Sequence, residues 1–326
     1  MKDFTSYSEK HRITIERELE RSLELVPDSP LKDKIAYVIS MGGKRVRPLV
    51  TVFAAEAVGE ANDDVLRGAA AIEILHNFTL VHDDIMDNAD TRRGKETVHV
   101  KNGVNTAILV GDLMMALAYD CLEKCGEKNL REALKIFNLS VKRVCDGQAL
   151  DEHLSKCTDT SLSHYLNMIA KKTGALLTAA GGLGALLGGG TPNHVRLLSD
   201  YGLNIGIAFQ ILDDVLDLEG DTERFGKPRG LDIIEKKKSF MFLKAQQIMD
   251  DNVFEIVNVA YRKPVVAEKD IVSVREAYRS AGVFDAAMRE VENYTGRALE
   301  TLNTLRKSEG KDALVELANS LVQRKF

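Results

Sequence analysis

Apolar residues recur at intervals of three and four along most of the chain, which is the spacing of one buried helix face. Between Leu31 and Met41 they fall at i, i+4, i+7 and i+8, and the stretches 130–150 and 280–325 repeat this pattern. We find no sustained alternation of apolar and polar residues bounded by hairpin turns. The pattern therefore predicts helices throughout and no strands.

Helix breakers are sparse and clustered. The chain has six prolines, and none lies between Pro48 and Pro192. Because proline disrupts a helix interior, this distribution permits long helices. The expected loops are short, at Glu60–Asp63, Arg92–Gly103, Glu219–Asp232 and Lys263–Asp270. No linker rich in proline, glycine or serine divides the chain. We therefore expect an all-α protein of about ten or more helices, forming a single domain over residues 1–326.

Composition and charge narrow the class of protein. Of 326 residues, 44% are apolar and 29% are charged, which excludes a disordered or collagen-like chain. The net charge of −5 argues against non-specific binding to nucleic acid. The four cysteines lack the spacing of a zinc site, so we expect reduced thiols and a cytoplasmic protein.

No membrane-spanning or secretory segment is expected. The first twelve residues contain no apolar run. The uncharged stretch Thr173–Asn193 has seven glycines and only five leucines, so its mean apolarity is low for a span. Small residues allow backbones to approach closely. This stretch is therefore predicted to be a tightly packed core or interface helix.

One five-residue acidic pattern occurs twice. D-D-x-x-D is found at Asp83–Asp87 and again at Asp213–Asp217, each time after an apolar helical run. The first and last aspartates share a helix face about 6 Å apart, which is unfavourable unless a cation lies between them. Carboxylate oxygens with room for water and phosphate suit Mg²⁺. A single copy is better explained by a solvated acidic face, but two copies that face each other across a cavity could clamp a diphosphate through bridging metal ions.

Basic residues accompany both acidic motifs. Arg92 and Arg93 follow the first motif, and the segment GGKRVRP at residues 42–48 precedes a long apolar run. Lys227 and the run 236–238 follow the second motif. Arginine binds phosphate in bidentate fashion and lysine acts as a point charge. In an acidic chain this placement favours diphosphate binding, and no P-loop motif competes with it.

These motifs together resemble the trans-isoprenyl diphosphate synthases, also called polyprenyl synthetases. The shared segments, in chain order, are GGKRVRP, LVHDDIMDNADTRRG, KKTG, FQILDDVLD and GKPRGLD. The resemblance implies one bundle of antiparallel helices around a deep central cavity, and a homodimer. It also implies that the two aspartate-rich motifs bind three Mg²⁺ ions together with an allylic diphosphate.

The resemblance assigns roles to individual residues. Asp83, Asp87 and Asp213 match the main metal ligands, and Asp217 supports them. The implied isopentenyl diphosphate site consists of Lys44, Arg47, His76 and Arg93. The implied allylic diphosphate and carbocation side consists of Arg92, Lys172, Thr173, Gln210, Lys227 and Lys237. Where the family often has Glu-Gly-Lys, the chain reads Glu235-Lys236-Lys237, so Lys236 and Lys238 stay alternatives to Lys237.

Some of these residues have simpler readings when taken alone. His76 on an apolar helix is typical of a core histidine, and Phe78 is typical of core packing. Thr173 alone fits a helix residue bonded to its own backbone, and Gln210 fits a surface amide.

The implied reaction is head-to-tail condensation. Isopentenyl diphosphate would attack the cation formed when dimethylallyl, geranyl or farnesyl diphosphate ionises, and a proton would then be lost. Phe78 lies five residues before Asp83 and is followed by the small Thr79. This arrangement resembles synthases of geranylgeranyl diphosphate (C20), with farnesyl diphosphate (C15) as the alternative product.

Other functions fit the sequence less well. A terpenoid cyclase or head-to-head synthase would not need GGKRVRP or Arg92 and Arg93. A non-catalytic partner subunit would usually lose acids or arginines from one motif. A di-iron carboxylate bundle is suggested by the E-x-x-H pairs ending at His76 and His99, but His99 falls in an expected loop.

Overall fold

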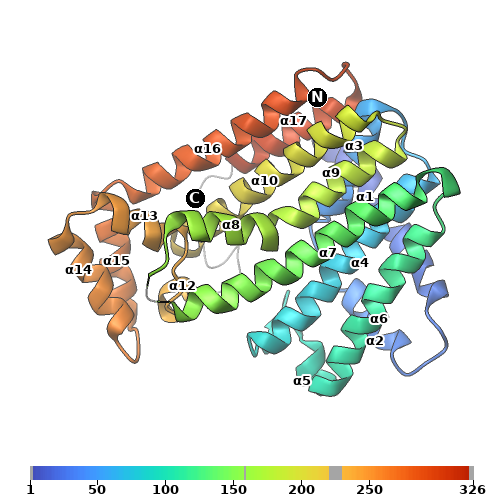
Figure 1. Cartoon of the computed structure of the whole chain (residues 1–326). Coiled ribbons are helices and arrows are strands. Elements are labelled where there is room, and N and C mark those ends of the chain that lie inside the picture. The colour runs from blue at the N-terminus through green and yellow to red at the C-terminus, as the bar shows by residue number, and fades with distance from the viewer. Residues whose placement is uncertain (1–2, 158, 220–229, 323–326) are drawn as a thin grey trace. The chain divides into compact units, whose positions relative to one another are not determined.

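The computed structural model describes residues 3–157, 159–219 and 230–322, and these residues are predominantly helical (Figure 1). The all-α prediction is confirmed. Residues 32–39 of the predicted segment at Leu31–Met41 are helical and bury Ile35, Val38 and Ile39. The stretches 130–150 and 280–325 also fall largely on helices.

The chain divides into two compact units. The first comprises Met1–Ser140, Leu176–Gly202 and Thr301–Glu316, and the second comprises Val141–Ala175, Leu203–Glu300 and Leu317–Phe326. Elements wholly in the first unit are α1 (Phe4–Ser22), the 3₁₀ helix η1 (Leu23–Leu25), α2 (Lys32–Ile39), α3 (Val46–Val58), α4 (Asp63–Met86), β1 (Thr91–Arg92), β2 (Lys95–Glu96), α5 (Val98–Asn102) and α6 (Val104–Glu123). Those wholly in the second are α8 (Leu162–Lys172), α12 (Leu231–Ile234), α13 (Phe240–Ile248), α14 (Asp251–Arg262) and α15 (Glu268–Ser280).

The remaining helices contribute residues to both units. They are α7 (Glu127–Lys156), α9 (Gly174–Leu187), α10 (Pro192–Glu219), α16 (Val283–Leu302) and α17 (Glu309–Val322). The first acidic motif lies at the C-terminal end of α4, in the first unit. The second lies at the C-terminal end of α10, in the second unit.

Helix α4 is the central helix of the first unit and has clear local determinants. The Asn62 side chain caps its N-terminus by accepting a hydrogen bond from Val65 N at 3.0 Å. Asp63 and Asp64 in the first turn complement the helix dipole. Its middle turns are almost completely buried, between α3 and α6 among others. The acidic motif is thus carried at the end of a helix that tertiary packing holds firmly.

The segment Arg92–Gly103 is more ordered than the sequence predicts. It contains Arg92 of β1 and the whole of β2, followed by α5. The two strands form an antiparallel ribbon in which Thr91 pairs with Glu96 and Arg92 with Lys95. The prediction of no strands was wrong here. Strands of two residues are too short to show the alternation by which a strand is recognised in a sequence.

Helix α9 confirms the prediction of a tightly packed core helix. It covers only 14 residues, and Leu176, Leu183 and Leu187 are buried. A Cβ atom on Gly184 would lie 2.1 Å from the carbonyl oxygen of Thr51 on α3, so only glycine permits this approach. Gly181 is limited in the same way by the carbonyl oxygen of Leu198 at 2.0 Å, so these two glycines are packing residues.

A different helix has the length and apolarity of a membrane span. Among the described residues, α6 alone passes this test, with a mean hydropathy of 1.3 over its most apolar window and 39% of that window buried. Core helices pass the same test, so its composition by itself is weak support for a membrane location.

Candidate active site

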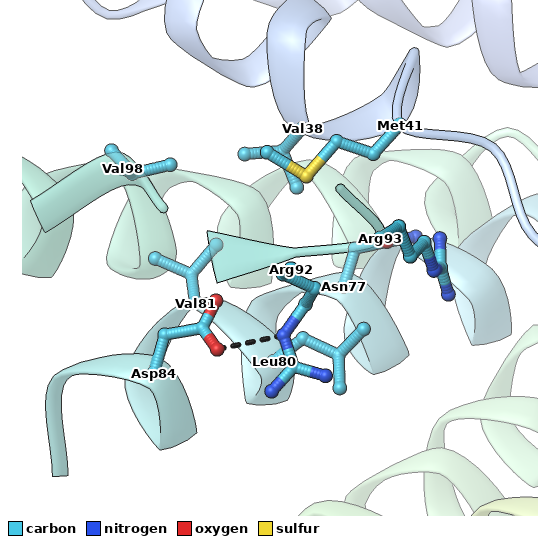
Figure 2. A pocket seen from close by; sticks show the side chains of 9 residues that line it. All are labelled: Val38, Met41, Asn77, Leu80, Val81, Asp84, Arg92, Arg93 and Val98. Carbon is cyan, nitrogen blue, oxygen red and sulfur yellow. Dashed lines mark hydrogen bonds and ion pairs between the residues drawn. The ribbon is translucent and has the colours of Figure 1, made fainter. Parts of the chain in front are cut away.

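The carboxylates of the first acidic motif differ in their exposure and in their partners. Asp87 is exposed and Asp83 is half-buried. Asp84 is buried and accepts a hydrogen bond from Arg92 Nε at 2.7 Å, as Figure 2 shows. Burial raises the pKa of Asp84, and the adjacent Arg92 opposes that shift. Asp83 and Asp87 are therefore the carboxylates of this motif that a metal ion can reach.

The two arginines after this motif are positioned by a tight turn. Arg93 and Gly94 both have positive φ, at 53° and 74°, between strands β1 and β2. Two such residues in a two-residue connection form the type I′ turn that matches strand twist. Arg92 reaches Asp84, whereas Arg93 donates to the carbonyl oxygen of Gly42. The hairpin thus brings Arg93 to the segment GGKRVRP.

A small cavity lies beneath the hairpin (Figure 2). Its floor and walls are largely apolar side chains from α2, α4 and α5, with Asp84 and both arginines at the same site. The lining residues are Val38, Met41, Asn77, Leu80, Val81, Asp84, Arg92, Arg93 and Val98. This apolar packing supports the aliphatic parts of the arginines while their charged groups are held by partners.

Arg45 anchors the segment GGKRVRP. Its side chain is fully buried, and its backbone adopts the left-handed region with φ of 50°. It donates to Glu16 at 2.8 and 3.0 Å, to Glu73 at 2.7 Å and to the carbonyl oxygen of Ile39 at 2.9 Å. Burial opposes the charge, but the two glutamates outweigh it, so the pKa of Arg45 is raised. The segment is therefore fixed by a buried ion-pair network.

Beside Arg45 lie two arginines, Arg47 and Arg93, together with His76. Arg47 Nη1 is 3.2 Å from His76 Nε2, and the buried Nε of Arg47 has no hydrogen-bond partner among the described residues. The Arg93 guanidinium borders the loop, 2.9 Å from where a Cβ on Gly43 would lie. Burial, followed by the charges of Arg47 and Arg93, holds the pKa of His76 well below its ordinary value. Such a group, rich in donors, is suited to a polyvalent anion.

Lys44 differs from its neighbours because its side chain is exposed. It directly precedes Arg45 at the edge of the same loop. The sequence-predicted residues Arg47, His76 and Arg93 are thus brought together in the first unit, with Lys44 at the edge.

The aspartates of the second acidic motif differ in exposure in the same way as those of the first. Asp213 is exposed and Asp217 is half-buried. The two carboxylate oxygens of Asp217 accept hydrogen bonds from the backbone of Leu231 and Asp232 at 3.2 Å, so this side chain also caps α12. Asp214 is buried and is held by three donors. Burial raises its pKa to about 7, against the effect of those hydrogen bonds.

Thr173 and Gln210 are joined to Asp214 in the second unit. Thr173 Oγ1 donates to Gln210 Oε1 at 2.8 Å, and Gln210 Nε2 donates to Asp214 Oδ1 at 3.2 Å. These contacts replace the simpler readings of Thr173 as bonded to its own backbone and of Gln210 as a surface amide. Lys172 forms an ion pair with Asp151 at 2.6 Å. A Cβ on Gly147 would lie 2.3 Å from Lys172 N, so glycine allows α7 to approach the end of α8.

The lysines after the second motif have different surroundings. Lys237 is half exposed and pairs with Glu235 at 2.6 Å, whereas Lys238 donates to the carbonyl oxygen of Cys157. Lys236 is exposed and has a positive φ of 58°. Lys227 lies outside the described residues. The roles of these lysines therefore stay predictions.

Each acidic motif offers part of a metal coordination shell. No group of three or more metal-ligating side chains gathers at one point within residues 3–157, 159–219 and 230–322. Each motif instead supplies two accessible carboxylates one helical turn apart. Mg²⁺ is commonly held by one or two carboxylates, with water and substrate phosphates completing its shell. The donor set therefore fits Mg²⁺ bound together with a diphosphate.

Comparisons with known proteins agree with this chemistry. The family model described as Polyprenyl synthetase matches residues 28–279. The chain belongs to the polyprenyl synthetase family. Its enzyme class is therefore that of the trans-prenyltransferases, as the motifs predicted.

The similarity of this polyprenyl synthetase to its relatives covers most of each chain. It is 36% identical to the short chain isoprenyl diphosphate synthase of Methanothermobacter thermautotrophicus, over 95% of this chain and 94% of the relative. It is 38% identical to the geranylgeranyl diphosphate synthase of Sulfolobus acidocaldarius, over 89% of both chains. A crystal structure of a geranylgeranyl pyrophosphate synthase matches with a TM-score of 0.91 and 37% identity, covering 98% of this chain and 99% of the other.

Four residues of this polyprenyl synthetase site were not predicted from the sequence. Arg45, Asp84, Tyr165 and Asp214 are buried and position the residues that were predicted. Asp84 and Asp214 occupy the second place of each D-D-x-x-D, so their position in the motif was the available signal. Arg45 lies within the segment GGKRVRP, so that motif was its signal, whereas Tyr165 carried none because only tertiary contacts reveal its partner.

The contacts also disfavour the di-iron alternative. Glu73 pairs with Arg45, and His76 lies against Arg47. His99 Nδ1 is 3.1 Å from the Thr97 hydroxyl. The residues of the two E-x-x-H pairs for which contacts are described are thus engaged with other side chains instead of converging on a metal centre.

Proposed function

We propose that this polyprenyl synthetase is a geranylgeranyl diphosphate synthase. It condenses isopentenyl diphosphate head-to-tail with dimethylallyl, geranyl or farnesyl diphosphate until the C20 product forms. The observation that carries the proposal is the group of Arg47, His76 and Arg93, with a buried guanidinium nitrogen that has no hydrogen-bond partner among the described residues. This group is the binding site expected for isopentenyl diphosphate, because the C–O bond of that substrate does not break during the reaction.

The proposed reaction balances without an added oxidant or reductant. The allylic C–O bond breaks, and its electron pair leaves with the diphosphate. The π pair of isopentenyl diphosphate forms the new carbon–carbon bond to the allylic cation. A proton then passes to the departing diphosphate, and its C–H pair becomes the new double bond. A protein base is not required, but the cation must be kept from water.

The proposed roles follow the two units. Asp83, Asp87 and Asp213, supported by Asp217, hold three Mg²⁺ ions. When bound, these ions stabilise charge on the leaving diphosphate. Lys44, Arg47, His76 and Arg93 bind isopentenyl diphosphate. The allylic diphosphate is bound by Arg92, Lys172, Lys227 and Lys237, while Thr173 and Gln210 face the cation with their dipoles.

The chain is further proposed to act as one polyprenyl synthetase domain and as a homodimer. The family match runs through residues of both units, which supports the single domain. An exposed apolar surface supports the dimer. It consists of Val100 on α5 and of Val104, Ile108 and Leu109 on the adjoining α6, which are 41–54% exposed. An exposed apolar surface of this kind is typical of an interface between subunits.

Four free cysteines support the proposed cytoplasmic location.

Product length is proposed to depend on Phe78. Its side chain is 8% exposed on α4, and its ring centroid lies 4.7 Å from that of His82. We expect Phe78→Ala to shift the main product beyond C20, because removing the ring deepens the space available to the growing chain. Chromatography of the dephosphorylated products measures this shift. The same product distribution in wild type and variant would contradict a role for Phe78 in chain length.

The decisive experiment is an assay of the purified chain with Mg²⁺, labelled isopentenyl diphosphate and each allylic starter. We expect products that end at C20. Relatives also include synthases named for geranylfarnesyl diphosphate, so product length must be measured directly. Products ending at C15 would favour farnesyl diphosphate synthase. An inactive isolated chain would favour a non-catalytic partner subunit, although both acidic motifs and the arginine pair are present.

A further inference from the structure

We propose that Tyr165 and Asp214 fix the polarity of a hydrogen-bond chain that turns oxygen lone pairs, and not N–H groups, toward the allylic cation. The inference deepens the proposed function and rests on it. Neither residue is proposed to touch substrate. Both act as positioning residues for Thr173 and Gln210.

The hydrogen-bond chain contains two hydrogen bonds that join α8 and the residue after it to α10. Tyr165 OH donates to Asp214 Oδ2 at 2.5 Å, and Thr173 Oγ1 donates to Gln210 Oε1 at 2.8 Å. Gln210 and Asp214, one turn apart on α10, are joined by the amide at 3.2 Å. A second donor, the backbone N–H of Phe240, reaches Asp214 Oδ2 at 2.8 Å. Every described contact of the carboxylate is thus with a donor.

The direction of each hydrogen bond follows from Asp214. Tyr165 OH and Phe240 N–H both donate to Asp214 Oδ2, and the Gln210 amide presents its NH₂ group, which can only donate, to Oδ1. The amide oxygen then faces Thr173 and accepts its single hydroxyl hydrogen. The lone pairs of Thr173 Oγ1 and the second lone pair of Gln210 Oε1 are left for a positive charge. The reversed amide would present an N–H group, which repels a cation.

The geometry makes this polarity stable. Asp214 and Tyr165 are only 6% and 5% exposed, so water does not compete for the carboxylate. Tyr165 and Phe240 N hold one carboxylate oxygen and direct the other toward Gln210. Preorganised dipoles of this kind cost no reorganisation when charge develops. Tyr165 therefore acts on the cation through two intervening side chains.

The test uses Tyr165→Phe, which removes one hydroxyl and keeps the ring. Its ligand is an ammonium analogue of the allylic cation, bound with Mg²⁺ and inorganic pyrophosphate, compared with the neutral carbon isostere. We expect affinity for the ammonium analogue to fall about tenfold, or about 1.4 kcal/mol, with less than twofold change for the isostere. We also expect kcat to fall by a similar factor at unchanged KM for isopentenyl diphosphate.

The matched control is Tyr201→Phe. Tyr201 is also a buried tyrosine, and its hydroxyl donates to the carbonyl oxygen of Leu314 at 2.7 Å, in the first unit. We expect both affinities and kcat to equal those of the wild type. An effect of Tyr165→Phe that is the same for the charged and neutral analogues would be structural and would overturn the inference. Tighter binding of the ammonium analogue would also overturn it, because the carboxylate of Asp214, without its hydrogen bond from Tyr165, would then dominate the interaction with the cation.

A second variant keeps the inference falsifiable if Tyr165→Phe folds poorly. In Asp214→Asn, the new amide can donate to Gln210 Oε1, so Gln210 is free to reverse. We expect a selective loss of ammonium affinity, on the order of 10²-fold. Equal losses for both analogues would overturn the inference. A wild-type chain without prenyl transfer would instead overturn the proposed function, so the two failures are distinguishable.

Discussion

Replacing Asp213 by asparagine is expected to lower kcat for prenyl transfer by on the order of 10²–10³-fold, the usual cost of losing one preorganised group that stabilises transition-state charge. Asp213 is the exposed first aspartate of the second motif. Asparagine keeps its size and removes the negative charge that a metal ion requires. Because ionisation of the allylic substrate depends on that charge, kcat should fall more than KM for isopentenyl diphosphate rises.

Single-turnover measurements with geranyl diphosphate over a range of Mg²⁺ concentrations check this expectation. The control is Asp200→Asn on the same helix, because Asp200 is 47% exposed in its ion pair with Arg196 at 3.4 Å. Its kcat should stay within twofold of the wild type. If Asp213→Asn retained full activity at every Mg²⁺ concentration, Asp213 would not be a metal ligand.

Replacing Arg45 by methionine is expected to destabilise the folded chain by about 3–5 kcal/mol, the cost of breaking a buried ion pair from one side. Arg45 is fully buried and Glu73 is 2% exposed, so the variant leaves a carboxylate without its partner away from water. Methionine preserves most of the side-chain volume, which separates the loss of charge from the creation of a cavity.

The midpoint of urea unfolding, followed by circular dichroism, measures this effect. Arg262→Met is the matched control, because Arg262 is 71% exposed in its pair with Glu255. Exposed ion pairs contribute about 0–1 kcal/mol, so the control should unfold near the wild-type midpoint. Equal midpoints for all three proteins would mean that the network around Arg45 contributes little to stability.

Much of the fold could be predicted from the sequence, because helices depend on local spacing. Apolar periodicity and the absence of proline correctly indicated helical segments such as α2 and the long α7. The same reasoning failed for β1 and β2, whose pairing involves two residues on each side. That ribbon depends on the positive φ of Arg93 and Gly94 and on the packing beneath it, which local patterns do not reveal.

The residues of the candidate site could be predicted less completely than the helices. Charged motifs marked Asp83 and Asp213 because the same acidic spacing occurs twice, each time after an apolar helical run. His76 and Gln210 became candidates only through the family resemblance, since a single histidine or glutamine on a helix has many explanations. His76 lies against Arg47, which comes from another helix, and Gln210 donates to Asp214, one turn away on the same helix.

The amino-acid sequence by itself determined the helical class, the two acidic motifs and the enzyme family, because these depend on residue type and short spacing. Only the tertiary structure decided which member of each motif is accessible and which is buried. Asp84 and Asp214 differ from their neighbours through Arg92 and Tyr165, which approach them from other elements of the chain. Burial and hydrogen-bond partners arise when distant segments pack together, and no local pattern encodes them.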